Sequence, residues 1–197
     1  MEFISWLFQS FTARDYISSL ALAMTIFGFI LAFNQYRKMQ KWKRSEFAAE
    51  HLSKLREDDA LALSVMLLDW ENREFAVPES YQHLTEENSF VHNRVALGRA
   101  LLPMNEAPDE SHPCGYSWVD CIYRDTFDAL FSYLELTEHF ISNKLITAQD
   151  VKPIAYILKQ VKGQNECEYT GFIPYIEQYD FTGATKLIKK FEDEKLF

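Results

Sequence analysis

The feature that most constrains this chain is an uncharged apolar run near its beginning. Residues 16–33 read YISSLALAMTIFGFILAF, eighteen residues without a charge, a proline, an asparagine or a glutamine. As an α-helix this run would be about 27 Å long, close to the hydrocarbon thickness of a bilayer. A helix that is apolar on every side can also be the centre of a large soluble core, but 197 residues leave little room for one. We therefore predict a transmembrane helix over residues 16–36.

The charges that flank the run predict its orientation. Only Glu2, Arg14 and Asp15 precede it, whereas a cluster of cations follows it. The residues of this collar are Arg37, Lys38, Lys41, Trp42, Lys43 and Arg44, with Tyr36 just before them. A cleaved signal peptide would need the basic segment first and small residues afterwards. Since cations accumulate on the cytoplasmic side, we predict an outside N-terminus, a basic juxtamembrane helix over residues 37–56 and a cytoplasmic C-terminal domain.

The first residues, MEFISWLFQSF, are too few to span a membrane but are rich in large apolar side chains. They suit a segment that lies in the outer membrane interface, which we assign to residues 1–15. The alternative is a disordered start.

Small residues follow one face of the predicted span. They recur at intervals of three and four positions, as Ser18, Ala21, Thr25, Gly28 and Ala32. Such a stripe lets two helices approach closely in lipid and predicts a homo-oligomer, although small residues are also common in spans by chance. In a bundle, the weakly polar residues of this face could line a constriction.

The remaining residues, 57–197, are enough for one domain, and their apolar positions recur at helical spacing. We predict helices over about 59–70, 89–102, 117–143 and 147–161, and two short ones around 180–183. Tyr123, Phe127, Leu130, Leu134 and Ile141 share one stripe of the longest and are its predicted core face. Residues 76–88 and 103–115 are expected to be loops, and no hairpin is expected. The predicted fold class is all-α: one transmembrane helix followed by one helical cytosolic domain.

The charge balance and the missing motifs exclude several functions. Residues 51–197 hold fourteen Lys and Arg against twenty-five Asp and Glu, which disfavours binding of DNA or long RNA. The chain has no nucleotide-binding glycine loop, nucleophile elbow or H-E-x-x-H motif. His112, Cys114 and Cys121 lie near one another but lack the spacing of a zinc site. We expect no enzyme activity, no metal and no cofactor; carboxylates such as Asp125 and Asp128 leave acid–base chemistry as a weaker alternative.

Arginines within apolar helices are the candidates for ligand binding. We predict that Arg94, Arg99 and Arg124, with His92 beside the first, contact phosphate, because a guanidinium grips two phosphate oxygens at once. Nearby Tyr116, Trp118 and Tyr123 could stack on a base. The structural alternative is that the arginines form salt bridges with Asp125 and Asp128.

The segment from Tyr123 to Phe191 contains R-D-x-F-D and a late aromatic-glycine pattern, and SEFAA follows the basic collar. These features resemble a broad set of bacterial proteins with one N-terminal span and a helical domain. The overall plan is also similar to a membrane effector of type III CRISPR systems, by architecture and without a diagnostic ligand motif. In that effector the cytosolic domain assembles as a tetramer and binds cyclic tetra-adenylate, which perturbs the membrane helices.

The resemblance implies an oligomeric antiviral defence effector of the bacterial inner (cytoplasmic) membrane, with a pore as the expected result of its assembly. Its implied partner is a cyclic oligonucleotide second messenger. The alternative from another class is a membrane-tethered scaffold that docks a protein partner and binds no nucleotide. A sensor should be stabilised by its ligand, whereas a scaffold should copurify with a partner.

Overall fold

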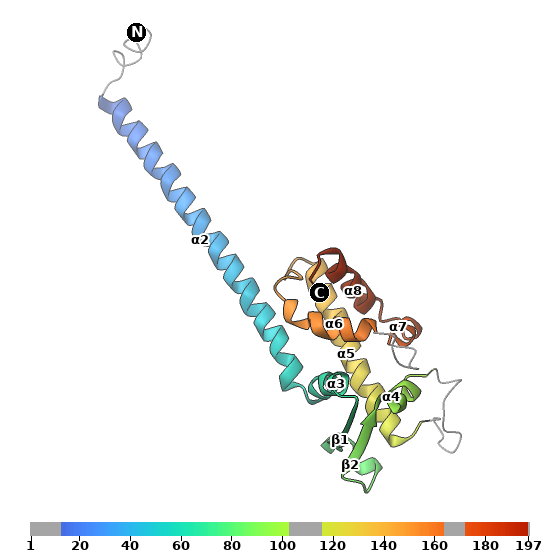
Figure 1. Ribbon diagram of the computed structural model, residues 1–197. Coiled ribbons are helices and arrows are strands. Elements are labelled where there is room, and N and C mark those ends of the chain that lie inside the picture. The colour runs from blue at the N-terminus through green and yellow to red at the C-terminus, as the bar shows by residue number, and fades with distance from the viewer. Residues whose placement is uncertain (1–12, 103–115, 164–171, 197) are drawn as a thin grey trace. The chain divides into compact units, whose positions relative to one another are not determined.

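The computed structural model describes residues 13–102, 116–163 and 172–196, which form two compact units, Met1–Ser45 and Glu46–Phe197. Residues 1–12 of the predicted interfacial segment lie outside the described residues. So do His112, Cys114 and Cys167. Helix α2, Ala13–Glu57, joins the predicted span and the juxtamembrane helix without a break (Figure 1). It is long and apolar enough to cross a membrane, and the described residues bury none of its apolar segment.

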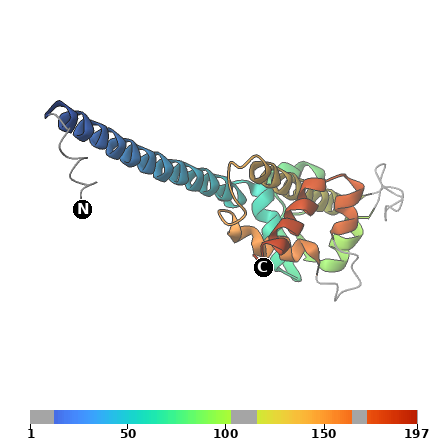
Figure 2. The same cartoon turned by 90° about the horizontal axis from the view of Figure 1, so that it is seen from above.

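The second unit is built around α5, Trp118–Ser142 (Figure 1, Figure 2). This helix contacts α3 (Asp59–Asp69), α4 (Arg94–Ala100) and α8 (Thr182–Asp193). A capping box formed by Ser117 and Asp120 starts this helix, and Asn143 ends it, as the sequence predicts. Its predicted apolar stripe is buried, with Phe127, Leu130 and Leu134 at 0% exposure. Helix α3, Asp59–Asp69, begins where the Asp58 carboxylate accepts a hydrogen bond from the Leu61 amide.

The expectation of a helix over residues 89–102 is wrong for its first part. Strand β2, Ser89–Asn93, pairs in antiparallel fashion with β1, Asn72–Ala76, and Phe75 lies opposite Phe90. Phe90 and His92 point inward and their neighbours outward, which is the period-two pattern of a strand. Asn93 then caps α4, Arg94–Ala100, by accepting from the Ala96 amide. The predicted loop between the strands contains a short 3₁₀ helix, η1, Glu79–Leu84.

Four short helices complete the domain: η3, Lys152–Ile154; α6, Ala155–Lys162; α7, Ile173–Gln178; and α8, Thr182–Asp193. Thr147 and Asp150 do bond reciprocally, as their sequence pattern predicts, but they close a turn and the α-helix begins at Ala155. The two C-terminal pieces, α7 and α8, confirm the predicted break around residue 180. In the part of the chain that the structure describes, β1 and β2 are the only strands, so the domain is helical as predicted.

The last turns of α2 belong to the core of the second unit, which therefore begins at Glu46. Phe47 packs edge-on against Phe140, with ring centroids 4.9 Å apart. His51 stacks on Tyr133 with centroids 4.4 Å apart, and its Nε2 lies 2.7 Å from Thr137 Oγ1. Because the Thr137 hydroxyl donates to the Tyr133 carbonyl, it accepts from His51 Nε2–H. Burial, together with the charge of Lys54, lowers the pKa of His51 to about 4.

Candidate functional site

Arg124 occupies the junction between α4 and α5. Its Nη1 donates to the carbonyl oxygens of Ala100 and Leu102, at 2.9 and 3.0 Å. These carbonyls belong to the end of α4, where a helix leaves its last acceptors without intrahelical donors. A cation there also complements the negative end of the helix dipole. Arg124 therefore stabilises the C-terminus of α4.

Three tyrosine rings surround the same guanidinium. Its Cζ lies 4.4 Å from the ring centroid of Tyr116, 5.1 Å from that of Tyr179 and 5.2 Å from that of Tyr175. Its Nη2 also donates to the Tyr179 hydroxyl at 2.5 Å. Three of the five N–H donors of Arg124 are thus used inside the protein, and its planar group is sandwiched by aromatic rings.

Arg99 projects from α4 toward the start of α5. Its Nη2 lies 3.1 Å from Asp120 Oδ1, and the Arg99 side chain is 49% exposed while that of Asp120 is 0% exposed. Asp120 also accepts from the amide and the hydroxyl of Ser117, so its carboxylate begins α5. Arg99 supplies the positive charge that a buried carboxylate requires.

Arg94 and His92 lie at the end of α3. Arg94 Nη2 donates to the Leu68 carbonyl at 3.5 Å, and His92 Nε2 donates to the Trp70 carbonyl at 2.9 Å. A carbonyl only accepts, so His92 Nδ1 accepts from the Tyr123 hydroxyl, also at 2.9 Å. Burial lowers the pKa of His92, which is 0% exposed. His92 therefore has no surface to offer a ligand in this structure, contrary to the predicted contact.

The predicted salt-bridge partners, Asp125 and Asp128, bind tyrosines. Asp125 accepts from the Tyr81 hydroxyl at 2.8 Å, and Asp128 accepts from the Tyr175 hydroxyl at 2.6 Å. Burial raises the pKa of the Asp128 carboxyl, against the effect of the Tyr175 hydrogen bond. The salt-bridge alternative is confirmed for Arg99, but with Asp120 as its partner in place of Asp125 or Asp128. Arg124 instead donates to two carbonyls and a hydroxyl.

The predicted ligand set thus divides between two places. Arg99 and Arg124 each join α4 to α5, through Asp120 and through the carbonyls of Ala100 and Leu102, whereas Arg94 and His92 belong to the end of α3. Of the aromatic residues predicted to stack on a base, Tyr116 is 4% exposed and Tyr123 is 0% exposed, so both belong to the core. Tyr179, 37% exposed and in contact with Arg124, was not predicted, because no spacing in the sequence links it to α5.

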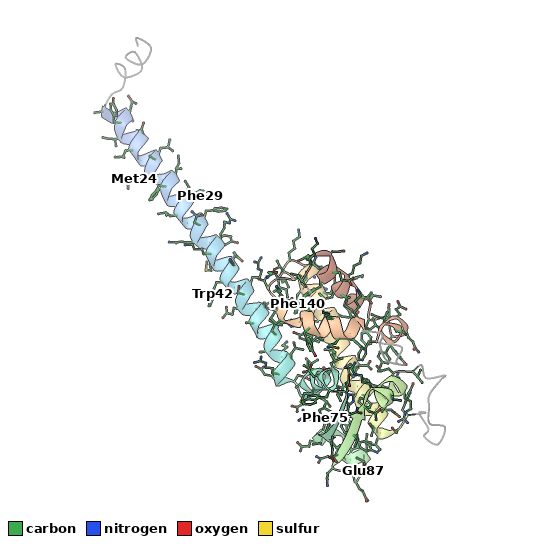
Figure 3. All side chains as sticks on the ribbon, in the orientation of Figure 1. Met24, Phe29, Trp42, Phe75, Glu87 and Phe140 are labelled. Atoms are coloured by element: carbon green, nitrogen blue, oxygen red, sulfur yellow. The ribbon has the colours of Figure 1, made fainter. Side chains whose placement is uncertain are left out.

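A second candidate is the outer surface of the β1–β2 hairpin, which we call the acidic hairpin face. Its exposed members are Glu71, Glu74, Glu79, Leu84, Glu86, Glu87 and Val91. Leu84 and Val91 are 47% and 66% exposed, so apolar surface stands among the carboxylates. Figure 3 places Glu87 at the outer end of this hairpin, while Phe75 lies at its inner side. Arg73, a cation of the same strands, stacks on Trp70 with its Cζ 4.5 Å from the ring centroid.

The acidic hairpin face was missed because the hairpin was missed. The alternation of Ser89, Phe90, Val91 and His92 is the signal that could have revealed the strand. It is short, and it runs directly into the helical pattern of α4.

The residues predicted to act in the membrane all lie on α2, where they are exposed except for the half-buried Arg44. A Cβ atom added at Gly28 would meet nothing within 4 Å, and the Thr25 hydroxyl donates to the Ala21 carbonyl at 2.9 Å. No described residue of the first unit therefore packs over the small-residue face. Packing of this face between copies of the chain stays a prediction.

Among the described residues, no three His, Cys, Asp or Glu side chains gather as a metal site requires. No known protein family matches the chain, and neither the curated proteins nor the solved structures contain a match.

Proposed function

We propose that this chain is a membrane-tethered scaffold: α2 anchors it in a bilayer, and its helical domain docks a basic protein partner through the acidic hairpin face. The proposal assigns no catalytic step. It corresponds to the second of the two functions that the sequence suggests.

The distribution of charge carries this proposal. Residues 51–143 hold seventeen Asp and Glu against six Lys and Arg, whereas residues 144–197 hold eight of each. Several of those six cations have structural roles, since Arg94, Arg99 and Arg124 bind the ends of helices. The exposed charge of the hairpin is therefore acidic, and exposed Val91 and Leu84 give a partner apolar area to bury. Complementary charge speeds association and selects the partner, while apolar contact adds affinity.

The test is partner capture by the full chain in lipid nanodiscs, compared between two charge-reversed variants. Glu74→Lys with Glu87→Lys changes the hairpin, and Glu177→Lys with Asp193→Lys makes the same change in charge at exposed sites on α7 and α8. We expect crosslinked partners to be lost from the hairpin variant and kept by the control. Equal capture by all three proteins would contradict the proposal.

The second candidate is the antiviral effector: an oligomer, with the tetramer as the expected size, that senses a cyclic oligonucleotide and perturbs the membrane through its spans. Two observations favour it: the Arg99 side chain is 49% exposed, and exposed Tyr179 contacts the Arg124 guanidinium. A guanidinium group and an aromatic ring suit a phosphate next to a base. The ligand would have to bind the active arrangement more tightly than the resting one, since equal binding shifts nothing.

Thermal unfolding of the full chain with cyclic tri-, tetra- and hexa-adenylate distinguishes the two candidates. At about 100 times Kd, binding to the folded state contributes about 2.7 kcal/mol, which raises Tm by roughly 5 °C or more in a domain of this size. For a sensor, one ring size should give this rise and Arg99→Gln should abolish it. A flat result with a well-folded chain would leave the scaffold.

A further inference from the structure

Residues 36–44 of α2, which contain the basic collar, form two chemically different sides of the helix. At about 100° per residue, Arg37, Lys38, Lys41 and Arg44 fall within an arc of about 120°. Three large apolar or aromatic side chains take the opposite arc, which also contains Lys43. Tyr36, Met39 and Trp42 are 54%, 50% and 63% exposed. Arg37 also reaches back over the ring of Phe33, with its Cζ 6.0 Å from the centroid. The segment is thus an amphipathic helix that directly continues the apolar run.

We propose that this collar is a binding site for anionic phospholipid headgroups, with Arg37, Lys38 and Lys41 as the phosphate-contacting cations and Trp42 as the interfacial anchor. The inference rests on the proposed membrane anchor. It adds a choice of lipid that anchoring alone does not require, since apolar side chains by themselves do not distinguish headgroups.

The chemistry of the segment selects a lipid surface as the partner. Lysine and arginine near an anionic leaflet each contribute about 1 kcal/mol of attraction, and this attraction fades within a Debye length. Exposed Trp, Tyr and Met side chains are suited to the boundary between headgroups and acyl chains. A soluble polyanion would leave that apolar side in water.

The negative net charge of the domain gives a physical reason for cations at this position in the chain. Residues 51–197 carry eleven more acidic than basic side chains, so an anionic membrane surface repels them. Phe47, three residues after Arg44 in the chain, is partly buried and already packs against the core of that acidic unit. Cations placed just before it offset the repulsion at the position in the chain where the domain begins.

The experiment measures how many spin-labelled lipids become motionally restricted around the full chain in phosphatidylcholine bilayers. Phosphatidylglycerol and phosphatidylcholine labels are compared for the native chain and for the variant Arg37→Gln, Lys38→Gln, Lys41→Gln. The control variant, Lys159→Gln, Lys186→Gln, Lys189→Gln, removes the same charge from exposed positions on α6 and α8.

We expect the native chain to prefer phosphatidylglycerol at least about twofold when averaged over all contacting lipids, and about fivefold for each cation at the collar itself. The preference should fall at high salt, disappear in the collar variant and persist in the control. Equal restriction of both labels by the native chain, or a preference that survives in the collar variant, overturns the lipid site and leaves the anchor intact. No restriction of either label means that α2 does not enter the bilayer, and both proposals then fail.

Discussion

The two compact units contain similar apolar side chains in opposite surroundings. In the first unit, Met24 and Phe29 are 67% and 71% exposed, and Figure 3 shows both projecting from a lone helix. In the second, Phe127 and Leu130 on α5 are 0% exposed. The same drive to leave water therefore has two outcomes: Phe127 is covered by other parts of the chain, whereas Phe29 requires a lipid or another molecule. The comparison makes different predictions for mutations in the two units.

The largest expected effect is the loss of a core ring. Phe127→Ala should lower the free energy of unfolding of the domain by about 3–5 kcal/mol, because a cavity remains where the ring stacked. Urea unfolding followed by circular dichroism measures this change. Phe29→Ala removes the same atoms from α2 and should leave the domain transition where it was. A comparable loss in both variants would mean that the two units share one core.

A charge in the middle of α2 should have nearly as large an effect, but on a different quantity. Ile26→Arg should cost about 3 kcal/mol of membrane insertion, since an arginine at the centre of a span is poorly solvated by lipid. The fraction of protein that resists alkaline extraction should fall, while the unfolding of the domain stays unchanged. Ile26→Leu is the control. Full membrane retention of the arginine variant would contradict a span centred here.

Acid should destabilise the second unit through His51. Its pKa is about 6.5 when unfolded and about 4 when folded, so the unfolded chain binds the proton more readily. Its contribution to stability is complete above pH 6.5 and is lost as the pH falls toward 4, up to about 3 kcal/mol. His51→Gln should flatten the dependence of stability on pH, leaving the slope due to His92. The exposed His139→Gln is the control, and an equal slope in both variants would exclude His51 as the cause.

The smallest effect compares two glycines. A Cβ at Gly183 on α8 would lie 3.0 Å from the Cα of Glu135 on α5, and the Gly183 amide donates to the Glu135 carboxylate at 3.0 Å. Gly183→Ala should therefore push the helices apart and cost about 1–3 kcal/mol in urea unfolding. Gly28→Ala on α2 meets nothing within 4 Å and should leave that transition unchanged. An unaffected Gly183→Ala variant would show that α8 shifts at little cost.

Local patterns were sufficient for the starts of α3 and α5, although the equally local Thr147–Asp150 pattern closes a turn and does not open the predicted helix. Asp58 before α3 and Ser117 with Asp120 at α5 are caps that act within four residues, so their sequence predicts where these helices begin. The apolar stripe of α5 is equally local, because the helical repeat alone selects its members. The hairpin could not be predicted in this way, since β1 and β2 pair across the residues of η1 and their alternation is only five residues long.

The candidate site shows the same limit. Sequence identified Arg94, Arg99, Arg124 and His92 as unusual residues in apolar surroundings, but their partners come from other elements: the end of α3 for Arg94 and His92, the end of α4 for Arg124, and Asp120 on α5 for Arg99. These contacts join residues that are 21 to 26 positions apart. No helical or strand periodicity encodes contacts over such separations.

By itself, the sequence determined a helix long and apolar enough for a membrane, a basic collar after it and a domain of helices, because composition and short-range periodicity act through immediate neighbours. Only the tertiary structure decided which polar groups form hydrogen bonds with one another. Unpaired carbonyls at the ends of α3 and α4 must find donors when they are buried, and packing brought the arginines and His92 to them. Packing also turned residues 89–93 into a strand and left the carboxylates of the hairpin facing outward.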